Sequence, residues 1–328
     1  MARTAQRRTR RSGARGATPA RMPATTLPDE PSLPDTPRGQ ARVALRYEDV
    51  LQDGRLALGA VPQALGEAVW RALLSVHPAS AKMRDDGIVP ILARLVIVGT
   101  DAPCSVDHPL DASGCYEVAA SHDASGAVER LHLNMWGALD GPRARTHDPQ
   151  PSRAGERQRV ARIFAEHVFT RPFAPPAERK VVRLALPGLP ELPAARYATR
   201  ALTALFAAPA AAIALDAEPT AEPTPHVFGI AHTDSNQHVN SLVYPRLFEE
   251  AAVRRLAEHG APATLAREVE LLYRKPSFAG ERLVIVLRAY RDGAGYLVTG
   301  AFYPPSALAT ATSLAAARPH CAVRMRLG

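Results

Sequence analysis

The chain has 328 residues, 46% hydrophobic and 22% charged, a composition typical of a globular protein long enough for two domains. Its formal charge of +8 points to a polyanion partner, but the excess is local. Residues 1–28 hold seven Arg and no acid, whereas residues 29–328 hold 33 basic and 32 acidic groups. We therefore expect no nucleic-acid binding by the folded body. The N-terminal charge is interpreted as a solvated arm, with a polyanion contact as the alternative.

Cysteine content and hydropathy indicate where the protein resides. The three cysteines, Cys104, Cys115 and Cys321, lack CxxC spacing, which disfavours a disulfide framework or a structural zinc site. The longest apolar run, Ala201–Leu215, is shorter than the roughly 20 residues of a membrane-spanning helix. No apolar segment of a secretory signal follows the Arg-rich start, although that start also fits an organelle transit peptide. We expect a cytoplasmic protein with no membrane contact.

The N-terminal half is predicted to be a flexible tail followed by one folded unit. Residues 1–41 are rich in Arg, Ala, Thr and Pro and are expected to be disordered. Residues 42–187 form the first unit, in which Val61–Val76 repeats apolar residues at three- and four-residue steps and predicts a helix. A surface loop is expected over residues 137–158. Strands are predicted after the helix at Ile88–Val98, Cys115–Ala119, Val128–Trp136 and Val160–Phe169.

The C-terminal half repeats this order after a connection. Residues 188–225 are rich in Pro and Ala and are interpreted as a linker containing a short helix near Arg196–Ala207. Residues 226–328 form the second unit, which starts with a short strand, His226–Ala231. The stripe of apolar residues over Ser241–His259 predicts a helix, with Pro245 in or just after its first turn. Further strands are predicted at Glu268–Tyr273, Arg282–Tyr290, Tyr296–Tyr303 and Cys321–Leu327.

The common order of strand, long helix and antiparallel strands indicates a degenerate internal duplication. Each unit is expected to wrap a curved antiparallel sheet around one helix, an α+β architecture. Two such sheets can join edge to edge, which hides exposed strand edges.

One polar segment precedes the second helix: Asp234-x-Asn236-x-His238-Val239-Asn240. Its simplest interpretation is a turn or a helix cap, because Asp and Asn favour both. The alternative is catalytic. A helix N-terminus carries partial positive charge that stabilises a developing oxyanion, a carboxylate can act as nucleophile or general base, and a histidine can move a proton near neutral pH.

This motif, with Tyr244 four residues after Asn240, resembles the hotdog-fold thioesterases, most closely the acyl-acyl-carrier-protein thioesterases, whose chains contain two hotdog units. The resemblance implies a double-hotdog fold, an active site of Asp234, Asn236 and His238, and substrate contacts by Val239, Asn240 and Tyr244. The resemblance in sequence motifs covers about residues 226–290, whereas over residues 42–187 only the order of predicted elements is similar. It implies an acyl-CoA or acyl-carrier-protein substrate and no cofactor.

Two features depart from the pattern of that family. Its plant members carry a Glu in a segment downstream of the motif, where this chain has Tyr273-Arg274-Lys275-Pro276-Ser277. The first unit keeps Asp49 and Asp53 before its helix but lacks the Asn and His, so it is interpreted as a non-catalytic copy whose acids form a turn. In hotdog pairs the pocket lies between the units, which makes Trp70 and Leu73 of the first helix candidate walls of an acyl tunnel, or simple core residues.

We therefore expect a thioesterase that releases a free acid and a thiol, as a monomeric pseudo-dimer or a homodimer. The alternatives are a non-catalytic acyl-thioester-binding or scaffold protein and, less favoured, a hotdog dehydratase or hydratase. A metal site formed by His232, Asp234 and His238 is disfavoured, because no further ligand stands at metal-binding spacing. Arg254, Arg255, Arg267, Arg274 and Lys275 are candidate contacts for a phosphate of coenzyme A or for an acidic carrier protein, while the simpler interpretation makes several of them solvated surface residues.

Overall fold

The computed structural model describes residues 27–31, 36–145, 155–262, 264–310, 314 and 317–328. Its N-terminal half contains one strand, a helical segment and four long strands. The elements are β1 (Arg38–Val43), η1 (Tyr47–Asp49), η2 (Leu58–Ala60), α1 (Gln63–Leu65), η3 (Gly66–Leu74), α2 (Ala79–Asp85), β2 (Val89–Gly99), β3 (Leu110–His122), β4 (Val128–Pro142) and β5 (Arg157–Thr170).

The C-terminal half repeats this plan behind a connection of short elements. The connection holds η5 (Pro176–Glu178), β6 (Ala195–Arg196), α3 (Leu202–Phe206), β7 (Ile213–Ala214) and β8 (Thr220–Ala221). The second half holds β9 (His226–Val227), η6 (Ile230–His232), α4 (Val243–Glu258), β10 (Ala266–Tyr273), β11 (Arg282–Asp292), β12 (Gly295–Tyr303), α5 (Pro305–Thr310) and β13 (Cys321–Leu327).

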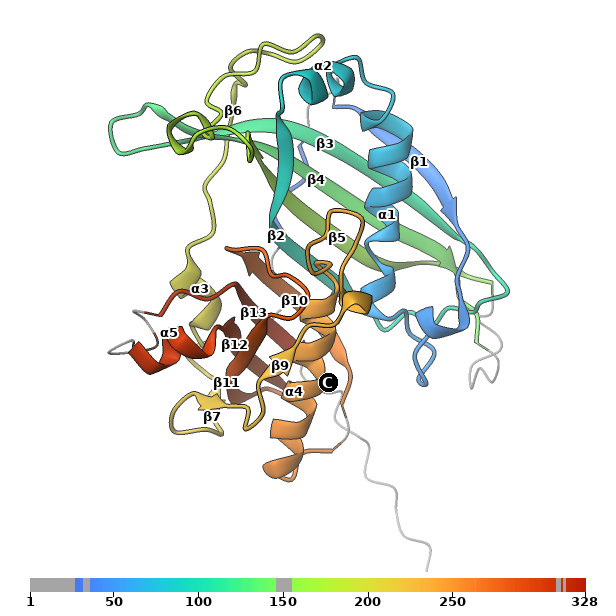
Figure 1. Cartoon of the computed structure of the whole chain (residues 1–328). Helices are drawn as coiled ribbons and strands as arrows, with labels where there is room; N and C mark the ends of the chain where they lie inside the picture. Colours follow the sequence, from blue (N-terminus) through green and yellow to red (C-terminus); the bar gives the residue numbers. More distant parts are fainter. Residues whose placement is uncertain (1–26, 32–35, 146–154, 263, 311–313, 315–316) are drawn as a thin grey trace, which may run out of the picture.

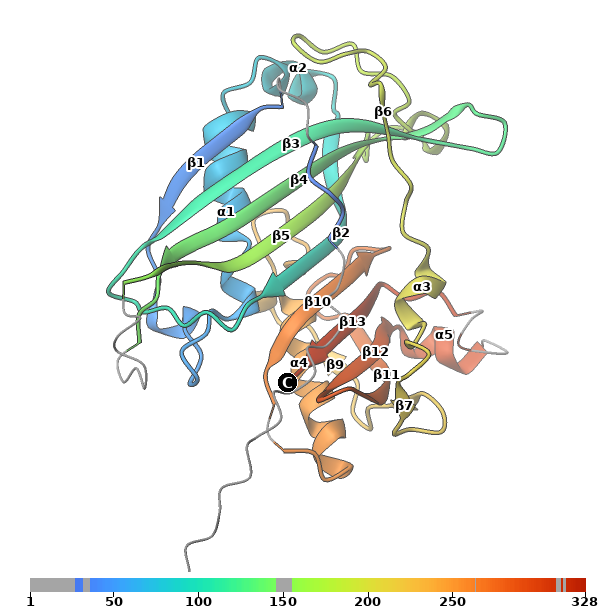
Figure 2. The ribbon, with the colours of Figure 1, turned by 180° about the vertical axis from the view of Figure 1, so that it is seen from behind.

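Within the described residues the strands form one continuous sheet, ordered β1-β3-β4-β5-β2-β10-β13-β12-β11-β7. The two halves join where β2 pairs antiparallel with β10, with Leu95 opposite Leu271 and Ile97 opposite Val269. The α1–η3 segment and α4 lie on the same face of this sheet, one over each half (Figures 1 and 2). The architecture is α+β, a double hotdog with two sheets joined edge to edge, as the sequence predicted.

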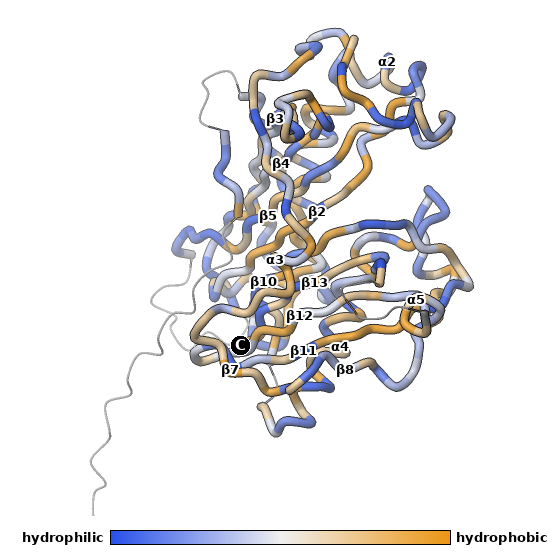
Figure 3. The backbone as a smooth tube through the Cα atoms, turned by 90° about the vertical axis from the view of Figure 1, so that its left-hand side faces the viewer, coloured by the Kyte–Doolittle hydropathy of each residue, from blue (hydrophilic) through white to orange (hydrophobic). Residues whose placement is uncertain are grey.

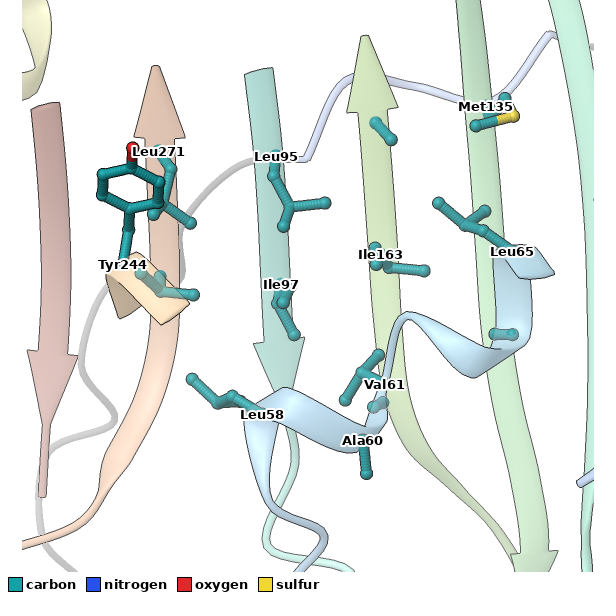
Figure 4. Packing of buried hydrophobic residues seen from close by; sticks show 14 of the residues in the cluster. Leu58, Ala60, Val61, Leu65, Leu95, Ile97, Met135, Ile163, Tyr244 and Leu271 are labelled. Carbon is teal, nitrogen blue, oxygen red and sulfur yellow. The ribbon is translucent and has the colours of Figure 1, made fainter. Parts of the chain in front are cut away.

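The main core lies between the helices and the sheet and runs across the junction of the halves. It includes Val61, Leu65 and Val69 of the first half together with Tyr244 and Phe248 of the second. Tyr244 and Leu58 both lie at the β2–β10 junction, near Leu95 and Leu271 (Figure 4). Figure 3 shows the apolar residues concentrated in the strands and the polar ones in the connecting loops.

Glycines in the strands allow each helix to approach the sheet closely. Gly114 of β3 and Gly137 of β4 are paired directly. A Cβ atom on Gly137 would stand 2.9 Å from Leu65 Cδ2, and one on Gly114 would stand 2.6 Å from Val69 Cγ2. Gly300 of β12 has the same position under α4, where an added Cβ would lie 2.9 Å from Phe248 Cε2. Both halves therefore use the same helix-on-sheet contact.

Several predicted elements are confirmed and others are corrected. The helix predicted over Ser241–His259 is α4, and Pro245 is its third residue, where a missing N–H leaves no intrahelical bond unmade. The helix predicted at Val61–Val76 exists, but its second part is π-helical, with Ser75 N donating to Trp70 O. The strand expected at His226–Ala231 was wrong beyond Val227, because η6 follows.

The predicted loop over residues 137–158 was wrong at both ends. β4 continues to Pro142 and β5 starts at Arg157, because each strand finds a backbone partner in the other; residues 146–154 lie outside the described residues. β1 starts at Arg38, inside the predicted tail of residues 1–41, and Trp136 Nε1 donates to Pro28 O. Residues 1–26 and 32–35 of that tail also lie outside the described residues. Our division into units at residues 42–187, 188–225 and 226–328 stays a proposal.

Candidate functional site

The polar motif forms a tight hairpin between η6 and α4, which we define as residues 232–242. Thr233 and Val239 form an isolated antiparallel bridge, and Asp234 N donates to His238 O over 3.0 Å. The Asp234 carboxylate accepts the N–H of Asn236 over 2.9 Å, which is an Asx turn. Gln237 has φ 64°, the left-handed conformation that closes the turn. Local hydrogen bonds thus place the polar side chains at one end of the central helix of the second half.

The three predicted catalytic residues all lie on this hairpin and differ in burial. Asp234 is half-buried, whereas Asn236 and His238 are exposed. The His238 ring packs edge-on against Phe278, with ring centroids 5.1 Å apart. Among the interactions of the described residues, no hydrogen bond joins the side chains of Asp234, Asn236 and His238 to one another. Their catalytic roles therefore stay a proposal.

The predicted substrate-contact residues fall into two groups. Asn240 forms a turn just before α4, because its Oδ1 accepts the N–H of Leu242 over 2.9 Å. Val239 and Tyr244 are buried in the core. Burial raises the pKa of Tyr244 to about 12, so its phenol stays neutral at physiological pH.

A loop of the second half holds the hairpin from the side, and the sequence alone missed its role. We define it as residues 274–281. Val239 N donates to Ser277 O over 2.8 Å, and Gly280 N donates to Phe228 O over 2.7 Å. Ser277 Oγ in turn hydrogen-bonds Nδ1 of His320, and both side chains are buried. Ser277 ends the stretch Tyr273–Ser277, which the sequence analysis singled out only because it lacks the Glu of the plant members. His320 lies too far from Ser277 along the chain for a local sequence pattern to predict their contact.

Trp70 and Leu73, the two candidate wall residues of the first helix, lie in different surroundings in the structure. A small pocket, partly open to solvent, lies beside η3 and α2. Trp70 lines this pocket, together with Leu74, Tyr116, Leu133, Phe169 and Leu189. Leu73 does not line it; this side chain packs against the main core and lies near the backbone of Gly39. The lining residues all belong to residues 70–189, so the pocket and the hairpin come from different halves.

In the first half, the acids at the corresponding place form turns. Asp49 is buried, and its carboxylate accepts the backbone N–H and the guanidinium of Arg46. Asp53 accepts the N–H of Arg55 over 3.1 Å and pairs with its guanidinium. These arginines hold the pKa of both carboxyls below their usual value against the opposing effect of burial. Asp49 and Asp53 thus make the local contacts that the turn interpretation expects, and the catalytic state of the first copy stays a prediction.

The arginines proposed to meet a phosphate are mostly engaged elsewhere. Arg254 pairs with Glu222, Arg255 with Asp216, and Arg267 with Asp101. Arg274 and Lys275 are exposed on the loop 274–281, next to the hairpin. In the described ranges, no group of three or more His, Cys, Asp and Glu side chains is arranged to hold a metal ion. None of the described helices is long and apolar enough to span a membrane.

The fold of this chain is that of proteins built from two hotdog units. It is similar to an acyl-ACP thioesterase from Bacteroides thetaiotaomicron, with a TM-score of 0.53 and 14% identity over 89% of this chain and 98% of that chain. It is also similar to the 12:0-ACP thioesterase from Umbellularia californica, with a TM-score of 0.51 and 12% identity over 89% and 97% of the two chains. At such identities the similarity shows the fold alone. No protein-family model and no curated protein matches the sequence.

Proposed function

We propose that this protein hydrolyses an acyl thioester to a free acid and a thiol, with Asp234, Asn236 and His238 as the reacting group of side chains. The observation that carries the proposal is the hairpin 232–242, which presents a carboxylate, an amide and an imidazole within five residues just before α4. The solved structures of the same fold include acyl-ACP thioesterases, which supports the reaction class.

In the proposed reaction, Asp234 either attacks the thioester carbonyl or removes a proton from a water that attacks it. A C–O bond forms, the C–S bond breaks, and the thiolate takes up a proton, for which His238 is the proposed carrier. Where Asp234 is the nucleophile, water then hydrolyses the mixed anhydride, which releases the free acid and restores the carboxylate. Asn236 orients the water or the carboxylate. The positive end of the α4 dipole favours the negative charge that develops on the carbonyl oxygen.

The two parts of the substrate are assigned to different halves. The acyl chain is proposed to enter the pocket beside Trp70, whose lining is mostly apolar. The phosphates of coenzyme A or of a carrier-protein arm are proposed to meet Arg274 and Lys275, which are exposed on the loop that also carries Phe278. The α1–η3 segment and α4 lie on the same face of the sheet (Figure 1).

The replacement Asp234→Asn tests the catalytic role directly. Asn keeps the side-chain oxygen that accepts the N–H of Asn236, so the turn is retained while the charge is lost. We expect kcat to fall about 100-fold or more, the usual contribution of a positioned acid or base. The measurement is thiol release and acid formation from acyl-CoA and acyl-carrier-protein thioesters of increasing chain length.

Asp123→Asn is the matched control. Asp123 makes the same Asx turn in the first half, where its Oδ1 accepts the N–H of Ser125 over 2.9 Å, so this variant keeps wild-type kcat. Equal hydrolysis by folded Asp234→Asn and wild type would remove Asp234 from the mechanism. Binding of the thioester without thiol release by wild type would favour a non-catalytic binding protein, and dehydration without thiol release would favour a dehydratase.

A further inference from the structure

Behind the hairpin lies a buried polar cluster that the proposed chemistry does not use. It consists of Ser277, His320 and the hydroxyl of Tyr244. Ser277 is fully buried, and His320 and Tyr244 are each 3% exposed. The Ser277 Oγ to His320 Nδ1 distance is 2.8 Å, and the Tyr244 phenol interacts with the Ser277 side chain. A buried polar group without a partner is destabilising, so these contacts define one arrangement of the three side chains.

Ser277 is the residue at which this cluster meets the hairpin. Its carbonyl accepts the N–H of Val239, between His238 and Asn240, while its side chain is bound to His320. The next residue, Phe278, contacts the His238 ring. A shift of Ser277 therefore moves the hairpin backbone next to His238, and it also moves Phe278, whose ring packs against the His238 ring.

His320 connects the loop 274–281 to the sheet. Its carbonyl accepts the N–H groups of Arg274 and Lys275, over 2.8 and 3.2 Å, and its own N–H donates to Phe302 of β12. The cluster thus links the central sheet of the second half to the backbone of the hairpin. Because Ser277 has no access to solvent, it is not available as a nucleophile.

We propose that Ser277 and His320 are positioning residues that hold the hairpin 232–242 in the geometry required by His238 and Asp234. The catalytic part of this inference rests on the proposed thioesterase function. Misplacing a reacting group by about 1 Å lowers rates by up to about 100-fold, so loss of the Ser277–His320 bond lowers kcat while substrate binding is retained.

The test compares Ser277→Ala with Ser121→Ala. Ser121 Oγ lies 3.1 Å from Nε2 of His132, so it belongs to a second buried Ser–His pair, on the sheet of the first half. Both variants lose one buried hydrogen bond, and we expect similar losses of stability. Ser277→Ala alone lowers kcat by about tenfold with KM within about twofold. Ser121→Ala keeps the wild-type kcat.

Two measurements of the hairpin do not depend on activity. Deuterium exchange at the Val239 N–H and the ring resonances of His238 report its position, and both change in Ser277→Ala but not in Ser121→Ala. His320→Asn, which keeps a polar atom near the position of Nδ1, retains more kcat than His320→Leu.

Unchanged Val239 exchange and His238 resonances in folded Ser277→Ala would overturn the positioning role. A wild-type kcat in that variant would overturn its catalytic consequence. If wild type hydrolyses no thioester, the proposed function fails, and the exchange and resonance measurements decide the positioning role separately.

Discussion

At the scale of single residues, His167 shows how burial alone changes an ionisable group. It lies on the inner face of β5, 8% exposed, with its ring edge-on to Trp70 at 5.7 Å. Its Nδ1 has no hydrogen-bond partner among the described residues. Burial lowers the pKa of His167 from 6.5 to about 4, so the ring is neutral at physiological pH.

This shift predicts a pH dependence of stability. Between pH 6.5 and about pH 4 the unfolded chain binds a proton at His167 and the folded chain does not, so stability falls as the pH falls through this window. The expected loss is about 3 kcal/mol by pH 4. His167→Phe removes this part of the dependence, as measured by urea unfolding at pH 7 and pH 4. If the free energy of unfolding changed equally between pH 7 and pH 4 in wild type and variant, the prediction would be contradicted.

At the scale of elements, the contact of α4 with the sheet depends on the absence of a side chain at Gly300. An added Cβ would stand 2.8 Å from Leu287 Cα and 2.9 Å from Phe248 Cε2. The first of these atoms is in the backbone of the neighbouring strand, so it cannot move without a shift of that strand, and the second is in the fully buried ring of Phe248 on the helix. Backbone separation is therefore set by this glycine.

Gly300→Ala is expected to lower the free energy of unfolding by about 1–3 kcal/mol or more, the range for overpacking in a core. Gly229→Ala is the control, because nothing lies within 4 Å of a Cβ at Gly229. The measurement is the urea midpoint of the two variants and wild type. An unchanged midpoint for Gly300→Ala would show that α4 is free to move away from β12.

At the scale of the whole molecule, a buried ionic network joins the halves on the outer face of the sheet. Arg94 of β2 pairs with Glu270 of β10 at 2.7 Å, and Arg200 of the connection adds a second contact to Glu270 at 3.3 Å. Tyr197 donates to Glu166 of β5 over 2.8 Å and accepts from Arg94 over 3.3 Å. Figure 2 shows the connection passing from β6 to α3 beside this junction. Residues 188–225 therefore bind the halves together as well as linking them.

Glu270→Gln is expected to destabilise the protein by about 3 kcal/mol, because it leaves the buried Arg94 guanidinium beside a neutral amide. Replacing both partners, in Arg94→Met with Glu270→Leu, is expected to recover most of that loss, since neither charge remains buried. Urea unfolding of the single and double variants measures both effects. A loss below about 1 kcal/mol in Glu270→Gln would indicate that the network is open to water.

Part of the fold and of the candidate site could be predicted from local sequence. Apolar periodicity located α4 and the strands of the second half to within a few residues. The spacing of Asp234, Asn236 and His238 located the hairpin, because an Asx turn involves only neighbouring residues. Of the two candidate wall residues, Trp70 lines the pocket and Leu73 packs against the main core, because helical periodicity does not say which of two inward-facing residues borders a cavity. A substrate contact by either residue stays a prediction.

The sequence by itself determined where α4 and the strands of the second half lie, that the order of elements occurs twice, and that polar groups precede the second helix, since these features depend on residues close along the chain. Only the tertiary structure decided the pairing of β2 with β10, the docking of the connection on the outer face, the π-helical turns of η3 and the contact of Ser277 with His320. The physical reason is that each of these features depends on which distant segments of the chain pack into one core. Arg94 and Glu270, for example, are in contact across the junction of the halves but stand 176 residues apart in the chain.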